Sequence, residues 1–136
     1  MNTIIKREYD YALRICAFLA GREEQTPISV SKLSKILMIT PAFATKIVHQ
    51  LKNQGILKTV QGKEGGVYLA KAPENLTIYD ILIAMGLEFR YNICLDEHHH
   101  CPWEEQCKLH NFFEQQENVL LEGLKNKTLA DVALTV

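Results

Sequence analysis

The 136-residue sequence has no uninterrupted apolar run near the ~20 residues that a helix needs to cross a bilayer. Its first residues also lack the apolar stretch of a secretory signal, because Glu8 and Asp10 interrupt it. The two absences lead us to expect a cytoplasmic protein with no membrane partner, in which thiols stay reduced. Clustered cysteines in that compartment are more often metal ligands or redox centres than disulfides.

The sequence also lacks the residue sets of common enzymes. It has no recognisable Ser/His/Asp set or paired acid/base motif, and no helix is expected after "GKEGG", which is therefore a turn rather than a nucleotide loop. Internal repeats and low-complexity tracts are absent as well. We expect a non-enzymatic protein made of one compact domain, or of a small domain with an extension.

Positive charge is scarce in the second half of the chain and abundant in the first. Residues 1–72 carry 11 Lys and Arg against 5 Asp and Glu, whereas residues 73–136 carry 4 against 11. Such a basic half is typical of a protein that binds a polyanion, but uneven charge is also common in small proteins without such a target. Charge alone leaves both interpretations open.

Helical periodicity begins near the N-terminus. The spacing of apolar residues predicts a helix over 8–20 that ends at Gly21. The expected buried stripe comprises Tyr9, Ala12, Leu13, Cys16, Ala17 and Ala20. We interpret Cys16 as a small buried hydrophobic residue rather than a ligand.

A short second helix is predicted from Val30 to Leu37, with Ser29 as its N-cap. Its inward side chains are expected to be Leu33, Ile36 and Leu37. Because only a brief link separates it from the next helix, the pair predicts a helix-turn-helix.

The third helix is expected to start at Thr40 and Pro41. A threonine N-cap accepts a hydrogen bond from the first free amides, and proline at the first helical position loses none. The helix should run to about Gln54, where Gly55 supplies a left-handed stop. Its predicted buried face is Ala44, Ile47, Val48 and Leu51.

The segments "ILKTV", "QGKEGG" and "VYLA" predict a strand, a glycine-rich turn and a second strand. A helix-turn-helix followed directly by a β-hairpin is the order of a winged helix. The next helix lies in "NLTIYDILIAMG", where Thr77 and Asp80 resemble a capping box.

A long final helix is predicted from about Pro102 to Lys125. Its apolar side chains are Leu109, Phe113, Leu120 and Leu124 on one side, with Phe112 and Val119 beside them. A small domain cannot cover so much apolar surface, so we expect the helix to pair with a copy of itself in a two-fold dimer. The alternative is that the helix folds back on its own domain.

The expected fold is therefore mainly α with a small β-hairpin wing. Residues 1–72 should form a winged helix-turn-helix DNA-binding domain. Residues 73–136 should form a linker helix, a cysteine-rich loop and a long C-terminal dimerisation helix.

Outward residues at the start of the second helix of a helix-turn-helix enter the major groove of DNA. There Lys46 can contact a phosphate or a guanine edge, while Lys63 and nearby glycine amides at the hairpin tip suit the DNA backbone or minor groove. The candidate DNA-binding residues are Thr40, Ala42, Thr45, Lys46, His49, Lys58, Gln61 and Lys63. Each alone is more often a solvated surface residue, but together on one motif they favour DNA contact.

The stretch "CLDEHHHCPWEEQC", residues 94–107, holds three of the four cysteines. His110 follows Cys107 by three residues and should face the same side of a helix. Thiolates from Cys94, Cys101 and Cys107 with one imidazole suit structural zinc, and they also suit an iron–sulfur cluster. Spacing alone leaves the choice open. The run of three histidines is interpreted as solvated.

The sequence resembles the winged-helix iron–sulfur regulators represented by IscR and NsrR over nearly its full length. The matching stretches are "YDYALRICAFLA", "ITPAFATKIVHQLKNQGILKTVQGKEGG", the cysteine triplet and "NKTLADV". The resemblance implies a dimer in which Cys94, Cys101 and Cys107 of each subunit hold a [2Fe-2S] or [4Fe-4S] cluster. The cluster would lie between the cysteine loop of one subunit and the first helix of the other.

Two residues compete for the fourth ligand within this resemblance. His110 matches the histidine of IscR-like members, and Asp10 in "DYALR" matches an aspartate that NsrR-like members supply from the partner subunit. The helix "TKIVHQLKNQG" is closer to the NsrR side, and we prefer Asp10. One departure is Gln61, which stands where the family's wing carries arginine and removes a positive charge near the DNA.

The expected function is a transcription regulator whose affinity for a pseudo-palindromic operator depends on a cluster that senses redox, nitric oxide or iron–sulfur status. One alternative is a zinc-stabilised winged-helix DNA-binding protein without sensing. Another is a redox or electron-transfer protein whose winged helix binds a protein partner.

Overall fold

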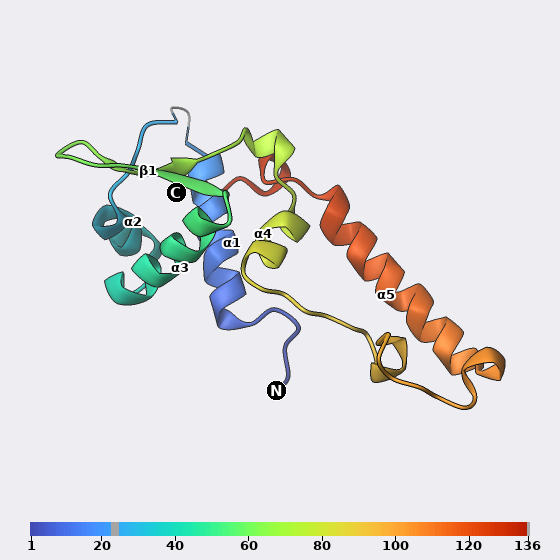
Figure 1. The fold of residues 1–136 in the computed structure, drawn as a ribbon. Helices are drawn as coiled ribbons and strands as arrows, with labels where there is room; N and C mark the ends of the chain where they lie inside the picture. Colours follow the sequence, from blue (N-terminus) through green and yellow to red (C-terminus); the bar gives the residue numbers. More distant parts are fainter. Residues whose placement is uncertain (23–24, 136) are drawn as a thin grey trace.

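The computed structural model describes residues 1–22 and 25–135 as a mainly helical body with a long protruding arm (Figure 1). The helices are α1 (Arg7–Ala20), α2 (Val30–Leu37), α3 (Pro41–Asn53), α4 (Ile78–Ala84) and α5 (Lys108–Asn126), and the strands are β1 (Leu57–Val60) and β2 (Gly66–Leu69). Short 3-10 turns lie at Pro73–Asn75, Ile93–Leu95, Glu104–Gln106 and Ala130–Val132. None of the described helices is long and apolar enough to cross a membrane.

Helix α1 is the centre of the body, and it packs against α3, α4 and β2. Its buried face differs from the predicted stripe because neighbours lie on more than one side. Ile15, Phe18 and Leu19 are buried as well. Leu13, Ala17 and Ala20 of the predicted stripe are only half-buried. Cys16 is fully buried as predicted, and this burial raises the pKa of its thiol to about 12.

Gly21 ends α1 as predicted, by a close approach rather than by a left-handed turn. Its backbone is right-handed, with φ of −81°. The C-terminal segment crosses here, because the Leu134 amide donates to the Ala17 carbonyl at 2.9 Å. A Cβ at Gly21 would overlap the carbonyl oxygen of Leu134.

Helix α2 begins as predicted, with the Ser29 hydroxyl accepting from the Lys32 amide at 3.2 Å. The predicted inward position of Ile36 is wrong, because its side chain is 38% exposed. Ser34 is buried in its place, and its hydroxyl donates to the Ser31 carbonyl at 2.8 Å. The inward face of this short helix runs through Leu33 and Ser34, which places Ile36 at its edge.

Helix α3 begins at Pro41, but the predicted threonine cap is absent. The Thr40 backbone is extended, as is usual before proline, and its hydroxyl makes no capping hydrogen bond. The proline ring already fixes a helical φ, so the start of the helix does not depend on a cap. At the other end Gly55 has φ of +79°, which confirms the left-handed stop.

The strands β1 and β2 pair antiparallel, with Leu57 opposite Leu69 and Val60 opposite Gly66. Ile28 adds an isolated bridge to Val67, which ties the hairpin to the segment before α2. The hairpin tip projects beyond the body at the end occupied by α2 and α3 (Figure 1). A helix-turn-helix with such a hairpin is a winged helix, which confirms the predicted fold class.

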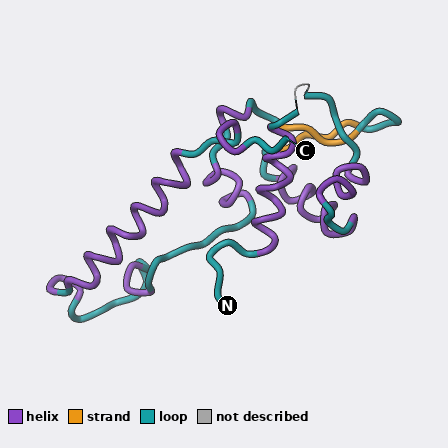
Figure 2. The backbone as a smooth tube through the Cα atoms, turned by 180° about the vertical axis from the view of Figure 1, so that it is seen from behind, coloured by secondary structure: helices purple, strands orange, loops and turns teal. Residues whose placement is uncertain are grey.

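Helix α4 begins with the predicted capping box. The Thr77 hydroxyl accepts from the Asp80 amide at 3.0 Å, and the Asp80 carboxylate accepts from the Thr77 amide at 2.9 Å. The chain then runs outward as a linker beside α5, and α5 returns to the body (Figure 2). Leu129 anchors this return, since it is fully buried and its amide donates to the Leu76 carbonyl at 2.8 Å.

The start of α5 differs from the prediction. A 3-10 turn occupies Glu104–Gln106, and the helix begins only at Lys108. Cys107 is extended at the N-cap, where its sulfur accepts from the His110 amide at 3.4 Å. This extended residue separates the 3-10 turn from the helix and prevents a continuous helix from Pro102.

The apolar residues of α5 also divide differently from the prediction. Phe113, Leu120 and Leu124 are half-buried, but Leu109 is 63% exposed. The linker packs against one face of the helix, where the rings of Tyr91 and Phe113 lie 5.6 Å apart. The other face stays open.

Candidate DNA-binding surface and cysteine-loop site

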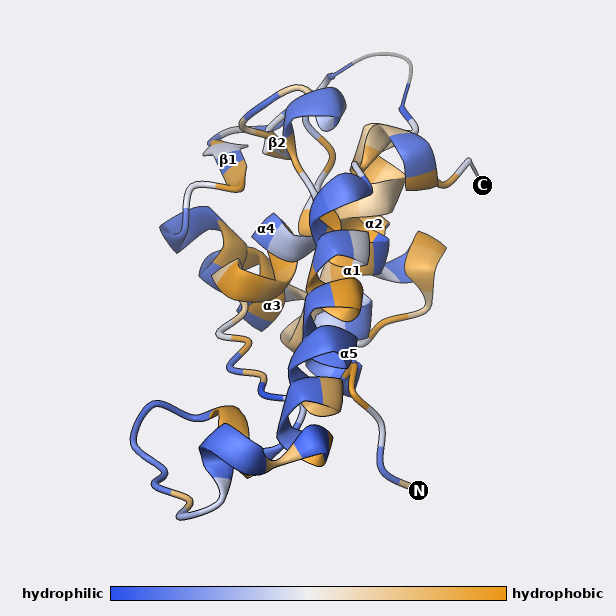
Figure 3. Ribbon diagram, turned by 90° about the vertical axis from the view of Figure 1, so that its right-hand side faces the viewer, coloured by the Kyte–Doolittle hydropathy of each residue, from blue (hydrophilic) through white to orange (hydrophobic). Residues whose placement is uncertain are grey.

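The outward face of α3 carries the predicted DNA-reading residues. Ala42, Thr45, Lys46 and His49 are all exposed. The opposite face is buried in the body, as predicted, through Ala44, Ile47, Val48 and Leu51. Figure 3 shows both hydrophobic and hydrophilic residues along α3, and a mostly hydrophilic loop below the body.

Hydrogen bonds restrict two of these side chains. The Thr45 hydroxyl donates to the Pro41 carbonyl at 2.8 Å, so it is left to act as an acceptor. The His49 Nε2 atom lies 3.2 Å from the Asn53 amide nitrogen. In the described part of the chain no ion pair engages Lys46, which leaves its ammonium group available to a phosphate or a base.

The wing presents the remaining candidates. Lys58, Gln61 and Lys63 are exposed along β1 and the hairpin tip, and Thr40 is exposed at the start of α3. Gly62 at the tip has φ of +108°, a conformation that favours glycine. The basic residues of the wing and of α3 therefore lie on exposed parts of one winged-helix motif.

The three loop cysteines are half-buried, and all are free thiols. The Asn92 amide donates to the Cys94 sulfur at 3.3 Å, and Cys107 accepts the backbone bond from His110. Within the described residues of a single chain, no three Cys, His, Asp or Glu side chains converge closely enough to hold a metal ion. One chain alone therefore does not assemble the predicted site.

The His110 ring lies beside the cysteine loop and close to two carboxylates. Its side chain is only 12% exposed, and Nε2 lies 3.7 Å from Glu104 and 3.6 Å from Glu114. Nδ1 is buried and has no hydrogen-bond partner. A metal-binding imidazole usually turns its second nitrogen toward a carboxylate, so this arrangement fits a ligand. The free thiols and the unpartnered Nδ1 thus fit a thiolate-bound iron–sulfur group.

Asp10 lies elsewhere on the chain. It is on α1 in the body, whereas the cysteine loop is at the far end of the arm (Figure 1). Its carboxylate forms an ion pair with Arg14 at 2.9 Å, and both side chains are roughly half exposed. The histidines at 98–100 are exposed, and the His98 amide donates to Asp96 at 2.9 Å.

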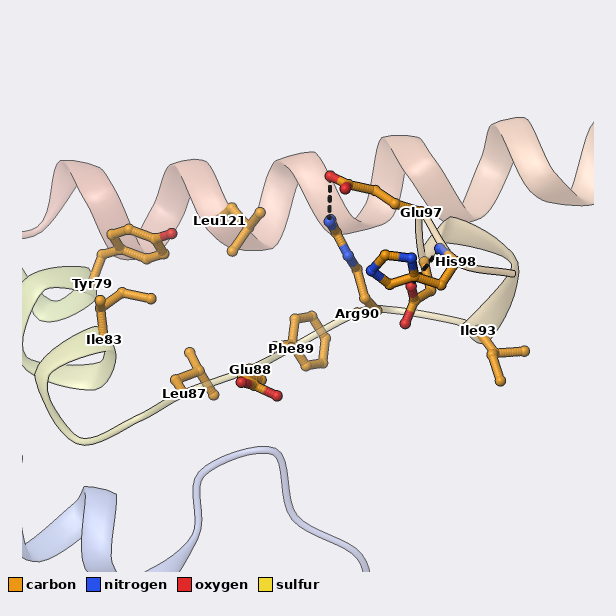
Figure 4. Close-up of a pocket in the computed structure, with 11 residues that line it drawn as sticks. Tyr79, Ile83, Leu87, Glu88, Phe89, Arg90, Ile93, Glu97, His98 and Leu121 are labelled. Atoms are coloured by element: carbon orange, nitrogen blue, oxygen red, sulfur yellow. Dashed lines mark hydrogen bonds and ion pairs between the residues drawn. The ribbon is translucent and has the colours of Figure 1, made fainter. Parts of the chain in front are cut away.

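Two residues that the sequence did not single out organise the base of the loop. Glu117 of α5 has a side chain only 6% exposed, accepts from the Tyr91 amide at 3.1 Å and lies 3.6 Å from the Arg90 guanidinium. Arg90 also lies 4.0 Å from Glu97 in the loop (Figure 4). The sequence offered one signal for Glu117, which is that it lies four residues from both Phe113 and Leu121 on an otherwise apolar face of the helix. We call this set (Glu117, Arg90 and Tyr91) the linker tether.

An open cavity of about 710 Å³ lies beside the tether, between α4, the linker and α5 (Figure 4). Its walls are largely apolar at Tyr79, Ile83, Phe89 and Leu121 and charged at Glu88, Arg90, Asp96 and Glu97. The arm also leaves apolar side chains exposed on one face of α5, namely Leu109, Phe112 and Val119. We call these three residues the open face of α5.

Comparison with known proteins bears on the whole chain. A protein of Aquifex aeolicus named as an HTH-type transcriptional regulator is 31% identical over 124 residues, covering 90% of this chain and 85% of the relative. The regulator NsrR of Bacillus licheniformis is 26% identical over 126 residues, covering 92% and 88%. The structure of CymR, the global cysteine regulator of Bacillus subtilis, superposes with a TM-score of 0.73 at 22% identity, covering 98% and 97%.

At 22% sequence identity, the similarity to CymR establishes only that the two chains share a fold. The family model described as Rrf2, iron-dependent transcriptional regulator, matches residues 5–135 and so includes the winged helix, the linker, the cysteine loop and α5. This chain is therefore a transcriptional regulator of the Rrf2 family.

Proposed function

We propose that the protein is a homodimeric regulator whose affinity for a pseudo-palindromic DNA operator is set by an iron–sulfur cluster. Cys94, Cys101 and Cys107 would hold the cluster. The observation that carries the proposal is the half-buried cysteine loop with free thiols, adjoining His110, whose buried Nδ1 has no partner. Bound there, the cluster would supply iron that responds to oxidants, nitric oxide or iron supply.

The fourth ligand has two candidates. His110 is close to the loop, and its Nε2 already faces carboxylates, which supports Nδ1 as a ligand. Asp10 of the partner subunit would have to exchange its ion pair with Arg14 for iron. A carboxylate is a harder ligand than a thiolate, so such a bond would be the more easily displaced.

The open face of α5 supports the dimer. Leu109, Phe112 and Val119 are 63%, 49% and 65% exposed, although all three lie on one side of the helix. Pairing with the same face of a second copy removes this apolar surface from water by two-fold symmetry. Two recognition helices in such a dimer would read half-sites about one DNA turn, ~34 Å, apart.

A route from the arm to the recognition helix passes through α4. The Gln50 side chain on α3 donates to the carbonyl of Ala84 at the end of α4, at 3.1 Å. The linker begins at Gly86, which has φ of +91°, and the linker tether holds this segment against α5. A displacement of the linker would therefore act on α3 through this end of α4.

Anaerobic purification tests the proposal directly. The protein should be coloured, with iron and acid-labile sulfide in similar amounts. Cys101→Ala or Cys107→Ala should remove the colour and leave a folded dimer, because the helical scaffold does not depend on the loop. A colourless protein that contains zinc would contradict the proposal.

That zinc result would support the second candidate function, a zinc-stabilised DNA-binding protein without sensing. Three thiols and the Nδ1 of His110 are also a donor set for tetrahedral zinc. In that case Asp10 would have no ligand role, and DNA affinity would not respond to oxidants or nitric oxide.

A further inference from the structure

Met38 occupies a costly backbone conformation in the turn between α2 and α3. It is the non-glycine residue with positive φ in the described chain, with φ of 55° and ψ of 42°. The turn needs this conformation, because the Met38 amide donates to the Lys35 carbonyl and the Ile39 amide to the Ser34 carbonyl. A left-handed backbone is unfavourable for residues with a Cβ, and glycine or asparagine is the usual choice at such a helix end.

The methionine side chain does not stabilise the fold in return. It is 89% exposed, whereas the next residue, Ile39, is 5% exposed and belongs to the core. Replacing Met38 by glycine would therefore relieve the backbone and lose no packing within the chain. A strained, exposed apolar residue in this position indicates that its side chain contacts another molecule.

The position of Met38 indicates what that contact is. It precedes Thr40 by two residues, so the two Cα atoms lie within about 7 Å of each other. Thr40 and Ala42 are both exposed at the start of α3, which is the end of a recognition helix that enters the major groove. A flexible thioether at this edge suits an apolar group on DNA, and the thymine methyl is the apolar group that the major groove presents.

We propose that Met38 is a specificity residue that packs against a thymine methyl at the edge of each half-site. The inference rests on the proposed operator binding and is independent of the cluster. It assigns base recognition to the turn as well as to α3.

The test uses the full chain and a duplex selected from a random pool for binding to it. Met38→Gly should raise the midpoint of denaturant unfolding and yet weaken binding by about four- to fifteenfold, the loss expected for one or two buried methyl-sized groups. Met38→Leu should keep the affinity. Replacing each thymine in turn by uracil should locate one position where the wild-type protein loses a similar factor and Met38→Gly loses none.

Three results would overturn the inference. They are undiminished binding by Met38→Gly, an equal loss on selected and random duplexes, and uracil effects that are the same in both proteins. Sedimentation supplies a fourth, because a changed oligomeric state in Met38→Gly would assign the side chain to a protein interface. Lys46→Ala separates this failure from that of the proposed function: if it weakens binding and Met38→Gly does not, operator binding stands and only the role of Met38 falls.

Discussion

At the residue scale, the surroundings of each thiol and of His110 determine which groups are free to bind. Cys16 is fully buried with a pKa near 12, so it stays protonated, whereas the three loop thiols are half-buried. His110 directs Nε2 toward two carboxylates and leaves Nδ1 without a partner. Asp10 is engaged with Arg14 in the isolated chain. The ligand assignment therefore depends on which of these two residues gives up its present surroundings.

The first prediction separates the two candidates for the fourth ligand. If Asp10 of the partner subunit is the ligand, Asp10→Ala should keep most of the iron, because the thiolates remain, and should make DNA affinity independent of cluster state. His110→Ala should then change little. Absorption spectra and DNA titrations of loaded and cluster-free protein measure both effects. A changed spectrum and DNA response in His110→Ala alone would make the histidine the ligand.

At the element scale, α3 and the wing present two kinds of surface to DNA. The outward face of α3 is backed by the core, so Lys46 is held on a rigid element. Lys63 lies in the turn beyond β1, where Gly62 has positive φ. Gln61, next to Gly62, is exposed and uncharged, so Lys63 carries the positive charge of this tip.

We predict different losses for the two lysines. Lys46→Ala should relax the preference at one base pair, at a cost of ~1–3 kcal/mol, because Lys46 is assigned to a base edge. Lys63→Ala should weaken binding to all sequences and reduce the salt slope by about one unit, because it is assigned to a phosphate. Salt titrations on specific and random duplexes measure both, and the reverse pattern would exchange the two assignments.

The linker tether gives a third prediction at this scale. Glu117→Ala leaves the Tyr91 amide without its acceptor, which should lower the free energy of unfolding by ~1–3 kcal/mol. The segment that carries Cys94 should then be released, so Cys94 in cluster-free protein should alkylate faster while Cys107 keeps its rate. Glu117→Gln retains an acceptor oxygen and should lie near the wild type. Mass spectrometry of alkylated peptides measures the rates, and equal acceleration of both thiols would mean general loosening instead.

At the scale of the whole molecule, the body forms its core within one chain, whereas the arm has surfaces that a second copy of the chain would cover. The body has a continuous core around α1, and Leu129 returns the end of α5 to it. The arm has the open face of α5, a half-open cavity and a cysteine loop that does not converge on a metal within one chain. We therefore expect a partner subunit to cover surfaces of the arm rather than of the body. The division into residues 1–72 and 73–136 stays a prediction.

The fourth prediction addresses the dimer. Val119→Glu places a charge on the open face and should dissociate the dimer, while the stability of the monomer should hardly change because the side chain is 65% exposed there. Asn118→Glu adds the same charge about 100° around the helix from Val119, at an exposed position outside the open face, and should remain dimeric. Sedimentation at several concentrations distinguishes them. A dimeric Val119→Glu variant would place the interface on another surface.

The order of the elements and the motif they form were predictable from the amino-acid sequence alone. Local signals act within a few residues, so Ser29, Gly55 and the Thr77–Asp80 capping box were predictable, as was the apolar side of α3. The resemblance in the quoted motifs predicted the family, which the family match confirms.

Tertiary packing set the features that depend on neighbours distant in the sequence. It turned Ile36 outward and moved the buried face of α1 onto Ile15, Phe18 and Leu19. It divided the apolar residues of α5 between a face covered by the linker and an open face. It also buried Glu117 against Arg90 and Tyr91, although Tyr91 lies 26 residues before Glu117 in the sequence. The physical reason is that periodicity records which side of a helix is apolar, whereas packing partners determine which part of that side is covered.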